Sequence, residues 1–251
     1  MLKLCLIGDP VGHSRSPAIQ NALLQKNGVE GYYKTVTVTP ETLADFMADA
    51  RAGAWDGFNV TMPLKTAILP LLDRLDETAR AMGAVNTVAV RNGKATGYNT
   101  DGCGFVRSLP FSPAGKKVLL LGNGGAAHAV GYALRQAGAE VTVCARHPVG
   151  EEHPWNELCK LSETCHLLVN ATSLGMSGKD VFPDLTFLER LPQGAAVYDL
   201  VYHPLDTALL QRAAALGYTA IGGLALLEAQ AEMAFRIFSD DRPNDISAKE
   251  Q

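Results

Sequence analysis

The sequence predicts an α/β protein made of two α/β domains, and three observations lead to this expectation. The first hundred residues alternate strand and helix patterns, and a second alternating pattern starts after the loop at residues 110–115. A glycine-rich turn joins the first strand of that second pattern to its helix. The chain has 251 residues, which is enough for two modest domains with separate cores.

Composition excludes several classes of function. The net charge is -4, and no block of five like charges occurs, so we expect neither a nucleic-acid-binding arm nor a polybasic membrane patch. The longest apolar runs are only as long as strands, and the N-terminus lacks the pattern of a signal peptide. We therefore expect a cytoplasmic protein that does not cross a membrane.

The cysteines predict neither a metal site nor disulfides. They are five, an odd number, and no two are spaced as CxxC. Reduced thiols are the simplest interpretation, and Cys5 and Cys144 fall inside predicted strands, where a thiol behaves as a small hydrophobic group. The cysteines are Cys5, Cys103, Cys144, Cys159 and Cys165.

In the first pattern, short residue pairs mark where a helix begins and where a hairpin turns. Ser16–Pro17 combines a capping residue with a proline suited to the first helical turn, and Asn92–Gly93 is a strong hairpin signal. The pattern predicts strands at residues 3–7, 32–38, 57–60, 85–91 and 94–98, and helices at 16–26, from Thr39–Pro40 to about 50, and over 65–82 with a break near Pro70.

The second pattern begins with an uninterrupted apolar strand at residues 117–121, as expected when helices cover both faces of a parallel sheet. Further strands are predicted at residues 140–144, 166–170, 195–200 and 218–221, and helices at 125–136, 205–216 and 224–238. The polar tail after Ser239 is expected to be frayed.

The glycine-rich turn has the spacing G-x-G-x-x-A of a Rossmann dinucleotide site. Gly122 permits the tight turn, Gly124 lets a phosphate approach the backbone, and the small Ala127 allows close packing of helix on strand. The N–H groups at the start of the helix would then bind the pyrophosphate. The alternative is a purely structural glycine turn.

The end of the second strand favours NADP over NAD. NAD-binding sites usually place an acid about 20 residues after the glycine turn, to bind the ribose 2′-hydroxyl. Here that position holds Ala145–Arg146–His147, and a guanidinium can bind a 2′-phosphate. The alternative is that Arg146 is an ordinary surface charge.

Polar side chains follow the predicted strands of the first domain. Ser14 and Ser16 place two hydroxyls at a helix entrance, which suits a carboxylate, although a simple cap at Ser16 would explain one of them. Thr61 and Lys65 follow the strand at 57–60. Taken alone, a lysine such as Lys65 is more often a solvated side chain than a functional one.

Two more polar residues lie between these segments and the second domain. Asn86 stands in apolar surroundings, so its amide needs partners from the backbone or from a ligand. Asp101 lies at the boundary between the domains, where it could merely cap the next helix.

Together these segments resemble the signature blocks of the shikimate dehydrogenase family, in the family's order and over nearly the whole chain. The sets N-V-T-x-P-x-K, G-A-V-N-T and N-T-D are highly specific when they occur together. The blocks are residues 8–17, 59–65, 83–87, 99–104, 122–127 and 170–176, and residues 223–231 resemble the family's closing helix.

The resemblance implies an NADP-dependent oxidoreductase that acts on a CH–OH group, reducing 3-dehydroshikimate reversibly to shikimate in the biosynthesis of chorismate and aromatic amino acids. It implies an N-terminal substrate-binding domain with a mixed sheet, residues 1–102 plus 225–251. The C-terminal domain, residues 103–224, would be a Rossmann NADP-binding domain, and the last helix would pack back on the first domain.

By matching positions, the resemblance also implies roles for single residues. Lys65 would be the proton donor and acceptor, paired with Asp101. The substrate-binding residues would be Ser14 and Ser16 for the carboxylate, Thr61, Asn86, Asp101 and Gln230 for the ring hydroxyls, and Tyr202 near the carboxylate. The cofactor-binding residues would be Gly122, Asn123, Gly124, Gly125, Ala126, Ala127, Arg146, Thr172, Ser173 and Gly223.

The chain departs from the family pattern chiefly at Arg146, which lacks the flanking Asn and Thr common in NADP-using members. Alternatives therefore stay open: a quinate/shikimate dehydrogenase that uses NAD, a member specialised for amino-shikimate analogues, a methylenetetrahydrofolate dehydrogenase, or a non-catalytic NADP-binding sensor. The intact Lys65 and Asp101 count against the sensor. We expect a monomer or a homodimer.

Overall fold

The computed structural model describes residues 1–239, which form two compact units. Unit 1 comprises Met1–Thr100 together with the segment that begins at Ala231, and unit 2 comprises Asp101–Gln230. The boundaries lie a few residues from the predicted ones, and the assignment of functional domains to these units stays a prediction. The predicted polar tail after Ser239 lies outside the described residues.

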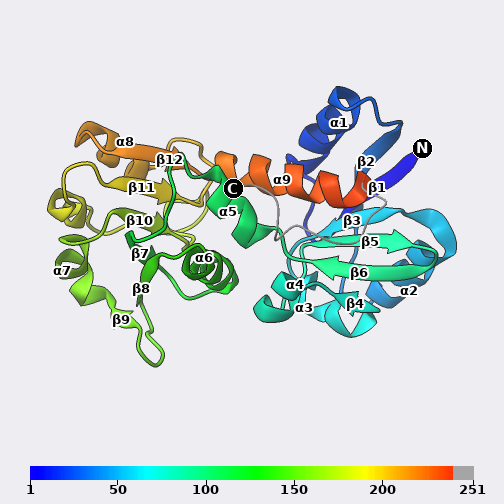
Figure 1. Cartoon of the computed structure of the whole chain (residues 1–251), viewed down its shortest axis with the longest axis horizontal. Coiled ribbons are helices and arrows are strands. Elements are labelled where there is room, and N and C mark those ends of the chain that lie inside the picture. Colours follow the sequence, from blue (N-terminus) through cyan, green and yellow to red (C-terminus); the bar gives the residue numbers. More distant parts are fainter. Residues whose placement is uncertain (240–251) are drawn as a thin grey trace. The chain divides into compact units, whose positions relative to one another are not determined.

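Unit 1 contains a six-stranded mixed sheet in the order β2-β1-β3-β5-β6-β4 (Figure 1). β1 is parallel to β2 and β3, whereas β5 is antiparallel to β3 and β6, so the predicted mixed sheet is confirmed. The strands are β1 (Leu2–Gly8), β2 (Gly31–Thr37), β3 (Gly57–Val60), β4 (Arg74–Leu75), β5 (Thr87–Arg91) and β6 (Lys94–Tyr98). The helices are α1 (Ser16–Lys26), α2 (Leu43–Asp49), α3 (Leu64–Ala67) and α4 (Glu77–Met82).

Alternate side chains of β1 enter two different cores. Cys5 and Ile7 belong to a cluster with α2 and α3, whereas Leu4 and Leu6 pack with α1 and with Phe235 from the last helix, α9 (Leu224–Ser239). These side chains are almost fully buried, and each of the leucine, isoleucine and phenylalanine side chains contributes on the order of 1.5–3 kcal/mol relative to an exposed position. Residues of α9 from Ala231 onward thus complete the core of unit 1.

Unit 2 contains a six-stranded, wholly parallel sheet in the order β12-β11-β10-β7-β8-β9 (Figure 1). This is the predicted parallel sheet, and helices pack on both of its faces through two separate apolar clusters. The strands are β7 (Lys117–Leu121), β8 (Glu140–Ala145), β9 (His153–Pro154), β10 (Leu167–Asn170), β11 (Ala196–Asp199) and β12 (Thr219–Gly222). The helices are α5 (Asp101–Ser108), α6 (Gly125–Gln136), α7 (Leu158–Ser162), α8 (Ala208–Ala215) and the first part of α9.

The predicted cap of α1 is wrong. Ser16 is the first residue of the helix, and its neighbour Arg15 is the N-cap, with no side-chain capping bond. The Ser16 N–H instead donates to Ser14 Oγ at 3.2 Å, because the preceding turn brings that hydroxyl beneath the helix. Pro17 is tolerated there since the N–H groups of the first turn have no partner within the helix.

Two other helices start later than predicted. The helix expected from Thr39–Pro40 begins at Leu43, because residues 39–42 close a turn with a 3.2 Å bond from the Thr42 N–H to the Thr39 carbonyl. The helix expected from residue 205 begins at Ala208, where the Thr207 hydroxyl oxygen accepts a bond from the third helical N–H. In both places a side-chain or turn hydrogen bond sets the boundary, which periodicity cannot resolve.

The helical prediction for residues 65–82 is wrong in the middle. The segment contains α3, a 3₁₀ turn at Leu69–Leu71, strand β4 and then α4. The N–H groups of Asp73 and Asp76 each donate to carbonyls of the β6 region at 2.9 Å, so this stretch adds an edge strand to the sheet. Pairing with a distant strand has overridden local helix propensity.

All five cysteines are free, and three of them are buried. Burial raises the pKa of Cys144 to about 11 and that of Cys165 to about 12, and it raises the pKa of Cys5 still further. These thiols are therefore protonated at neutral pH and act as small apolar side chains.

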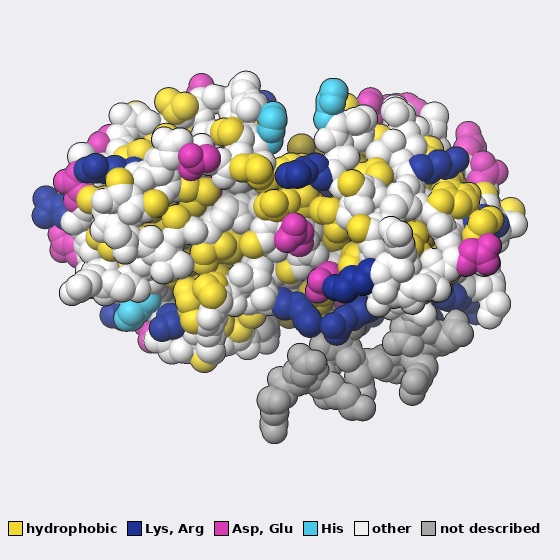
Figure 2. Space-filling model, turned by 90° about the horizontal axis from the view of Figure 1, so that it is seen from above, with side chains coloured by type: hydrophobic (Ala, Val, Ile, Leu, Met, Phe, Trp, Pro, Cys, Tyr) yellow, Lys and Arg dark blue, Asp and Glu magenta, His cyan; other side chains and the backbone are white. Residues whose placement is uncertain are grey.

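Across residues 1–239, no helix combines the length and the apolar character needed to cross a membrane. Acidic and basic side chains both occur on the face shown in Figure 2, with hydrophobic side chains between them. The exposed large apolar side chains include Met62 and Tyr202, which belong to segments predicted to bind the substrate.

The contact between α5 and α6 depends on a glycine. A Cβ at Gly102 would lie 2.7 Å from the carbonyl oxygen of Ala129 and 2.9 Å from Ala133 Cβ. We expect Gly102→Ala to lower the free energy of unfolding of unit 2 by about 1–3 kcal/mol, since this crowding is against backbone. Urea unfolding measures the change. Gly124→Ala is the control, because a Cβ there meets nothing within 4 Å and stability should stay unchanged; equal losses would contradict the role of close packing at Gly102.

Candidate functional site

The two predicted carboxylate-binding serines lie together. Ser14 Oγ and Ser16 Oγ are 3.1 Å apart at the N-terminus of α1, and both side chains are half-buried. The Ser14 N–H donates to the Val11 carbonyl at 3.2 Å, so a tight turn fixes the first hydroxyl. Two hydroxyl donors at the positive end of an eleven-residue helix form a suitable site for an anion.

Thr61 and Lys65 follow β3, as the sequence predicts. The Thr61 N–H donates to the Ile7 carbonyl at 2.9 Å, which holds this residue at the ends of β1 and β3. Gly8 makes the approach possible, because a Cβ there would lie 2.5 Å from Thr61 Cγ2. Lys65 is half-buried in α3, and its carbonyl accepts the Val85 N–H at 2.8 Å, which ties α3 to the segment before β5.

Asn86 is buried, with 4% of its surface exposed, and it has partners in the protein. Its Oδ1 accepts the Thr100 N–H at 2.8 Å and the hydroxyls of Thr87 and Thr100 at 3.0 and 3.2 Å. Its own carbonyl accepts the Val60 N–H and a 3.0 Å bond from Asn59 Nδ2. The amide therefore connects β3, β5 and Thr100, where the first segment of unit 1 ends.

The other predicted substrate residues lie in unit 2. Asp101 is the first residue of α5 rather than a flanking cap, and negative charge in a first helical turn is favourable. Tyr202 follows β11 and is exposed, whereas Gln230 is half-buried in α9. A Cβ at Gly104 would lie within 2.9 Å of the Gln230 backbone, so this glycine lets α5 and α9 pack closely.

The glycine turn between β7 and α6 has the geometry that a pyrophosphate needs. Gly122 has φ +100°, and a Cβ there would lie 2.9 Å from Thr172 Cγ2, so this glycine is required by the fold itself. Gly124 has φ -80°, and neither Gly124 nor Gly125 has any atom within 4 Å of an added Cβ. The fold leaves these two positions open, which fits a ligand lying against the backbone.

Thr172 is held next to this turn by a buried polar network that the motifs do not predict. The Thr172 N–H and hydroxyl donate to Asn170 Oδ1 at 3.0 and 2.6 Å, and Asn170 Nδ2 donates to Asp199 Oδ1 at 2.9 Å. Asp199 also accepts from the Thr207 hydroxyl at 2.6 Å and the Val201 N–H at 3.0 Å. The only signal in the sequence is an acid inside the apolar strand predicted at 195–200.

Burial affects the charge of this network. It raises the pKa of Asp199 above its ordinary value, and the hydrogen bonds from Thr207, Val201 and Asn170 oppose that rise. Ser173 is exposed beside the network. Gly223 is buried, and a Cβ there would collide with the carbonyl oxygen of Leu200. The hydrogen bonds of Asn170 and Asp199 thus order the loops that follow β10 and β11. Residues predicted to bind the nicotinamide half of the cofactor lie in or near these loops.

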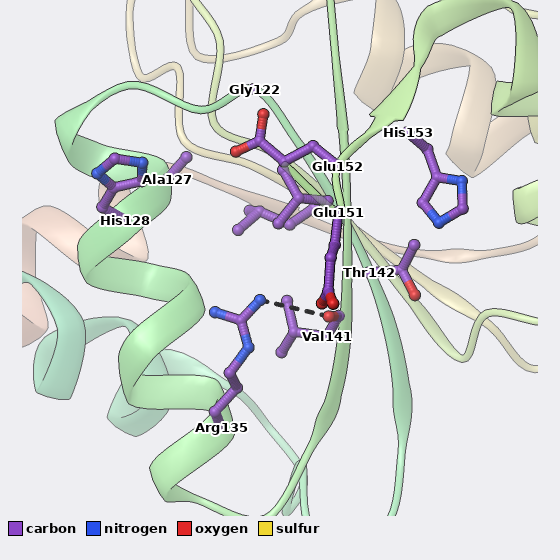
Figure 3. A pocket seen from close by; sticks show the side chains of 11 residues that line it. Gly122, Ala127, His128, Arg135, Val141, Thr142, Glu151, Glu152 and His153 are labelled. Atoms are coloured by element: carbon purple, nitrogen blue, oxygen red, sulfur yellow. Dashed lines mark hydrogen bonds between the residues drawn. The ribbon is translucent and has the colours of Figure 1, made fainter. Parts of the chain in front are cut away.

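A cavity of about 380 Å³ starts at Gly122 and runs between α6 and β8 (Figure 3). Glu151, Glu152 and His153 also line the cavity, and no motif in the sequence predicts their place there. Asn123 Nδ2 donates to Glu152 Oε2 at 2.8 Å and to the His147 carbonyl at 3.0 Å. Arg146 is exposed at the end of β8. No group of three metal-ligating side chains occurs within residues 1–239.

Comparison with known proteins places this geometry in a family. A family model described as "Shikimate dehydrogenase substrate binding domain" matches residues 6–88. A shikimate dehydrogenase (NADP(+)) of Geobacter metallireducens is 41% identical over 96% of this chain and 92% of its own length. The chain belongs to the shikimate dehydrogenase family.

Solved structures of the family superpose closely on this chain. Shikimate 5-dehydrogenase of Thermus thermophilus, in complex with NADP(H) and shikimate, is 38% identical with a TM-score of 0.85, covering 95% of this chain and 94% of that one. The enzyme of Listeria monocytogenes, in complex with shikimate and NAD, is 30% identical with a TM-score of 0.85, covering 95% and 92%. Both cofactors therefore occur among relatives with this fold.

The open glycine gives a test of the cofactor turn. We expect Gly124→Ala to fold with unchanged stability and to bind NADPH at least tenfold more weakly, because the methyl group would occupy the space left for the pyrophosphate. Titration of NADPH fluorescence measures the affinity. Gly12→Ala, which also meets nothing within 4 Å, is the control in unit 1. Unchanged NADPH affinity in Gly124→Ala would contradict the assignment.

Proposed function

We propose that this chain catalyses the reversible, NADP-linked reduction of 3-dehydroshikimate to shikimate in the cytoplasm, as a step in the biosynthesis of chorismate and aromatic amino acids. The observation that carries the proposal is the pair of serine hydroxyls 3.1 Å apart at the start of α1, within a chain of the shikimate dehydrogenase family. Shikimate is a carboxylate, and this site offers two hydroxyl donors and the positive end of a helix dipole.

Unit 1 is proposed as the main substrate-binding domain. Ser14 and Ser16 bind the carboxylate, and Thr61 and Asn86 bind ring hydroxyls. By their positions in the family motifs, Asp101 and Gln230 are also proposed to bind ring hydroxyls, and Tyr202 is proposed to bind the carboxylate. Asn86 is proposed for this role by its position in the family motif, and its bonds with Thr87 and Thr100 hold the amide in a fixed position.

Unit 2 is proposed as the NADP-binding domain. Residues 122–127 would hold the pyrophosphate at the start of α6, and the open positions at Gly124 and Gly125 support this. Arg146 would bind the 2′-phosphate through its exposed guanidinium. Thr172, Ser173 and Gly223 would hold the nicotinamide half, and the buried bonds of Asn170 and Asp199 support a fixed position for Thr172.

When bound, NADPH would supply the hydride for the carbonyl carbon. Negative charge then develops on the carbonyl oxygen, and the Lys65 ammonium stabilises it and donates the proton that completes the hydroxyl group. In the reverse direction Lys65 takes that proton back, and Asp101 is proposed to keep the lysine oriented. The reaction consumes one NADPH and one proton for each ketone reduced, and the lysine regains its proton from solvent.

An activity assay on the purified chain tests the proposed function. We expect shikimate to be oxidised with NADP, and quinate to be oxidised with a much lower kcat/KM, as judged by NADPH absorbance. A higher kcat/KM for quinate would favour the quinate/shikimate alternative. Binding of NADPH without any oxidation of shikimate would favour the non-catalytic sensor and contradict the proposal.

Lys65 gives the sharpest test of the mechanism. We expect Lys65→Ala to lower kcat by at least a thousandfold, because both the charge and the proton source are lost, and to leave the Kd for NADPH within about twofold. Lys26→Ala, an exposed lysine at the end of α1, is the matched control and should retain full activity. A loss of NADPH affinity as large as the loss of rate would refute the proton-transfer role.

A further inference from the structure

Glu152, in the segment between β8 and β9, contacts the glycine-rich turn through Asn123. Glu152 Oε2 accepts hydrogen bonds from Asn123 Nδ2 at 2.8 Å and from the Val149 N–H at 2.9 Å. Asn123 Nδ2 also donates to the His147 carbonyl at 3.0 Å. The loop from residue 147 to residue 152 is thus fastened to the glycine turn, and the Glu152 carboxylate lies beside Gly122 (Figure 3).

A carboxylate beside the first glycine of such a turn has a recognised chemistry. In dinucleotide-binding folds an acid at this place accepts a hydrogen bond from the 2′-hydroxyl of the adenosine ribose, and it disfavours the 2′-phosphate of NADP. That acid normally stands at the end of the second strand. In this chain the strand end holds Arg146, and the acid reaches the turn from six residues further along the chain.

We infer that Glu152 is a cofactor-specificity residue and that it enables the chain to use NAD as a second cofactor besides NADP. The inference rests on the proposed function and names a further property of the same cofactor site. The Glu152 carboxylate provides an acceptor for the ribose 2′-hydroxyl of NAD, while Arg146 provides the cation for the 2′-phosphate of NADP.

The two side chains act on the two cofactors in opposite directions. Within residues 1–239 Arg146 forms no ion pair, and Glu152 is half-buried with hydrogen bonds only to Oε2, so Oε1 is left for a ligand hydroxyl. A 2′-phosphate carries roughly two negative charges and is repelled by a nearby carboxylate. Selectivity for NADP is therefore weaker than Arg146 alone would give.

The chain offers a matched control in Glu151. It adjoins Glu152 and carries the same charge, but it is exposed, accepts no hydrogen bond among the described residues, and extends toward the end of the cavity near Arg135 (Figure 3). Glu151→Gln and Glu152→Gln change the net charge equally. Any difference in cofactor preference between the two variants therefore comes from the position of the carboxylate and not from the change in net charge.

The test measures Kd for NADPH and NADH by fluorescence, and kcat/KM for NADP and NAD with shikimate, in the wild type and both variants. We expect measurable NAD-linked oxidation in the wild type. Glu152→Gln should raise the NADP-to-NAD ratio at least fivefold, with weaker NADH binding and tighter NADPH binding, whereas Glu151→Gln should leave the ratio unchanged. Arg146→Gln should move the ratio the opposite way.

Several results would overturn the inference. An unchanged ratio in Glu152→Gln would do so, and so would equal losses for both cofactors, which would mean that Glu152 only fastens the loop to Asn123. Absence of NADH binding and of NAD-linked activity in the wild type would also refute it. The binding measurements need no substrate, so they decide the role of Glu152 even if shikimate is not oxidised and the proposed function fails.

Discussion

The buried amide of Asn86 is the interaction on which the substrate side of the structure depends. Its Oδ1 accepts three hydrogen bonds, two of them from Thr100, the residue that precedes Asp101. An unpaired amide at this depth would cost about 1–3 kcal/mol, so the network must form as a whole. It fixes the end of β3, the start of β5 and the point where the chain leaves unit 1.

The cofactor side depends on a comparable set of buried hydrogen bonds. Asp199 and Asn170 are both fully buried, and together they order the loops after β10 and β11. Thr172 then packs against Gly122, whose positive φ only glycine adopts readily. The space beside Gly124 and Gly125 is therefore bordered by backbone that these hydrogen bonds already hold in place. Such ordering lowers the entropy lost when a dinucleotide binds.

Most of the fold could be predicted from the sequence, because local signals agreed with one another. The strand 57–60, the strand 117–121 and the helix 125–136 have the predicted bounds, and the Asn92–Gly93 hairpin is confirmed by positive φ at both residues. β4 could not be predicted, since it exists only through pairing with β6. No periodicity marks such a short edge strand.

The candidate site was predictable only in part. Family blocks identify the site residues by position, but they do not reveal the partners that hold them. The roles of Asp199 and Glu152 arise from contacts over 29 residues in each case, from Asn170 and from Asn123. Side chains brought together by folding leave no spacing to detect in the sequence. The predicted cap at Ser16 fails for a local reason, because Ser14 is only two residues away and the preceding turn directs the Ser16 N–H to its hydroxyl.

Direct transfer of a hydride between NADPH and 3-dehydroshikimate is the property on which the proposed function rests. The most direct measurement uses NADPH that carries deuterium at its transferable position, with the product examined by NMR. We expect shikimate with one deuterium on the carbon of the newly formed carbinol, and none washed out to solvent. Formation of shikimate without that deuterium, or no reduction of 3-dehydroshikimate at all, would contradict direct transfer.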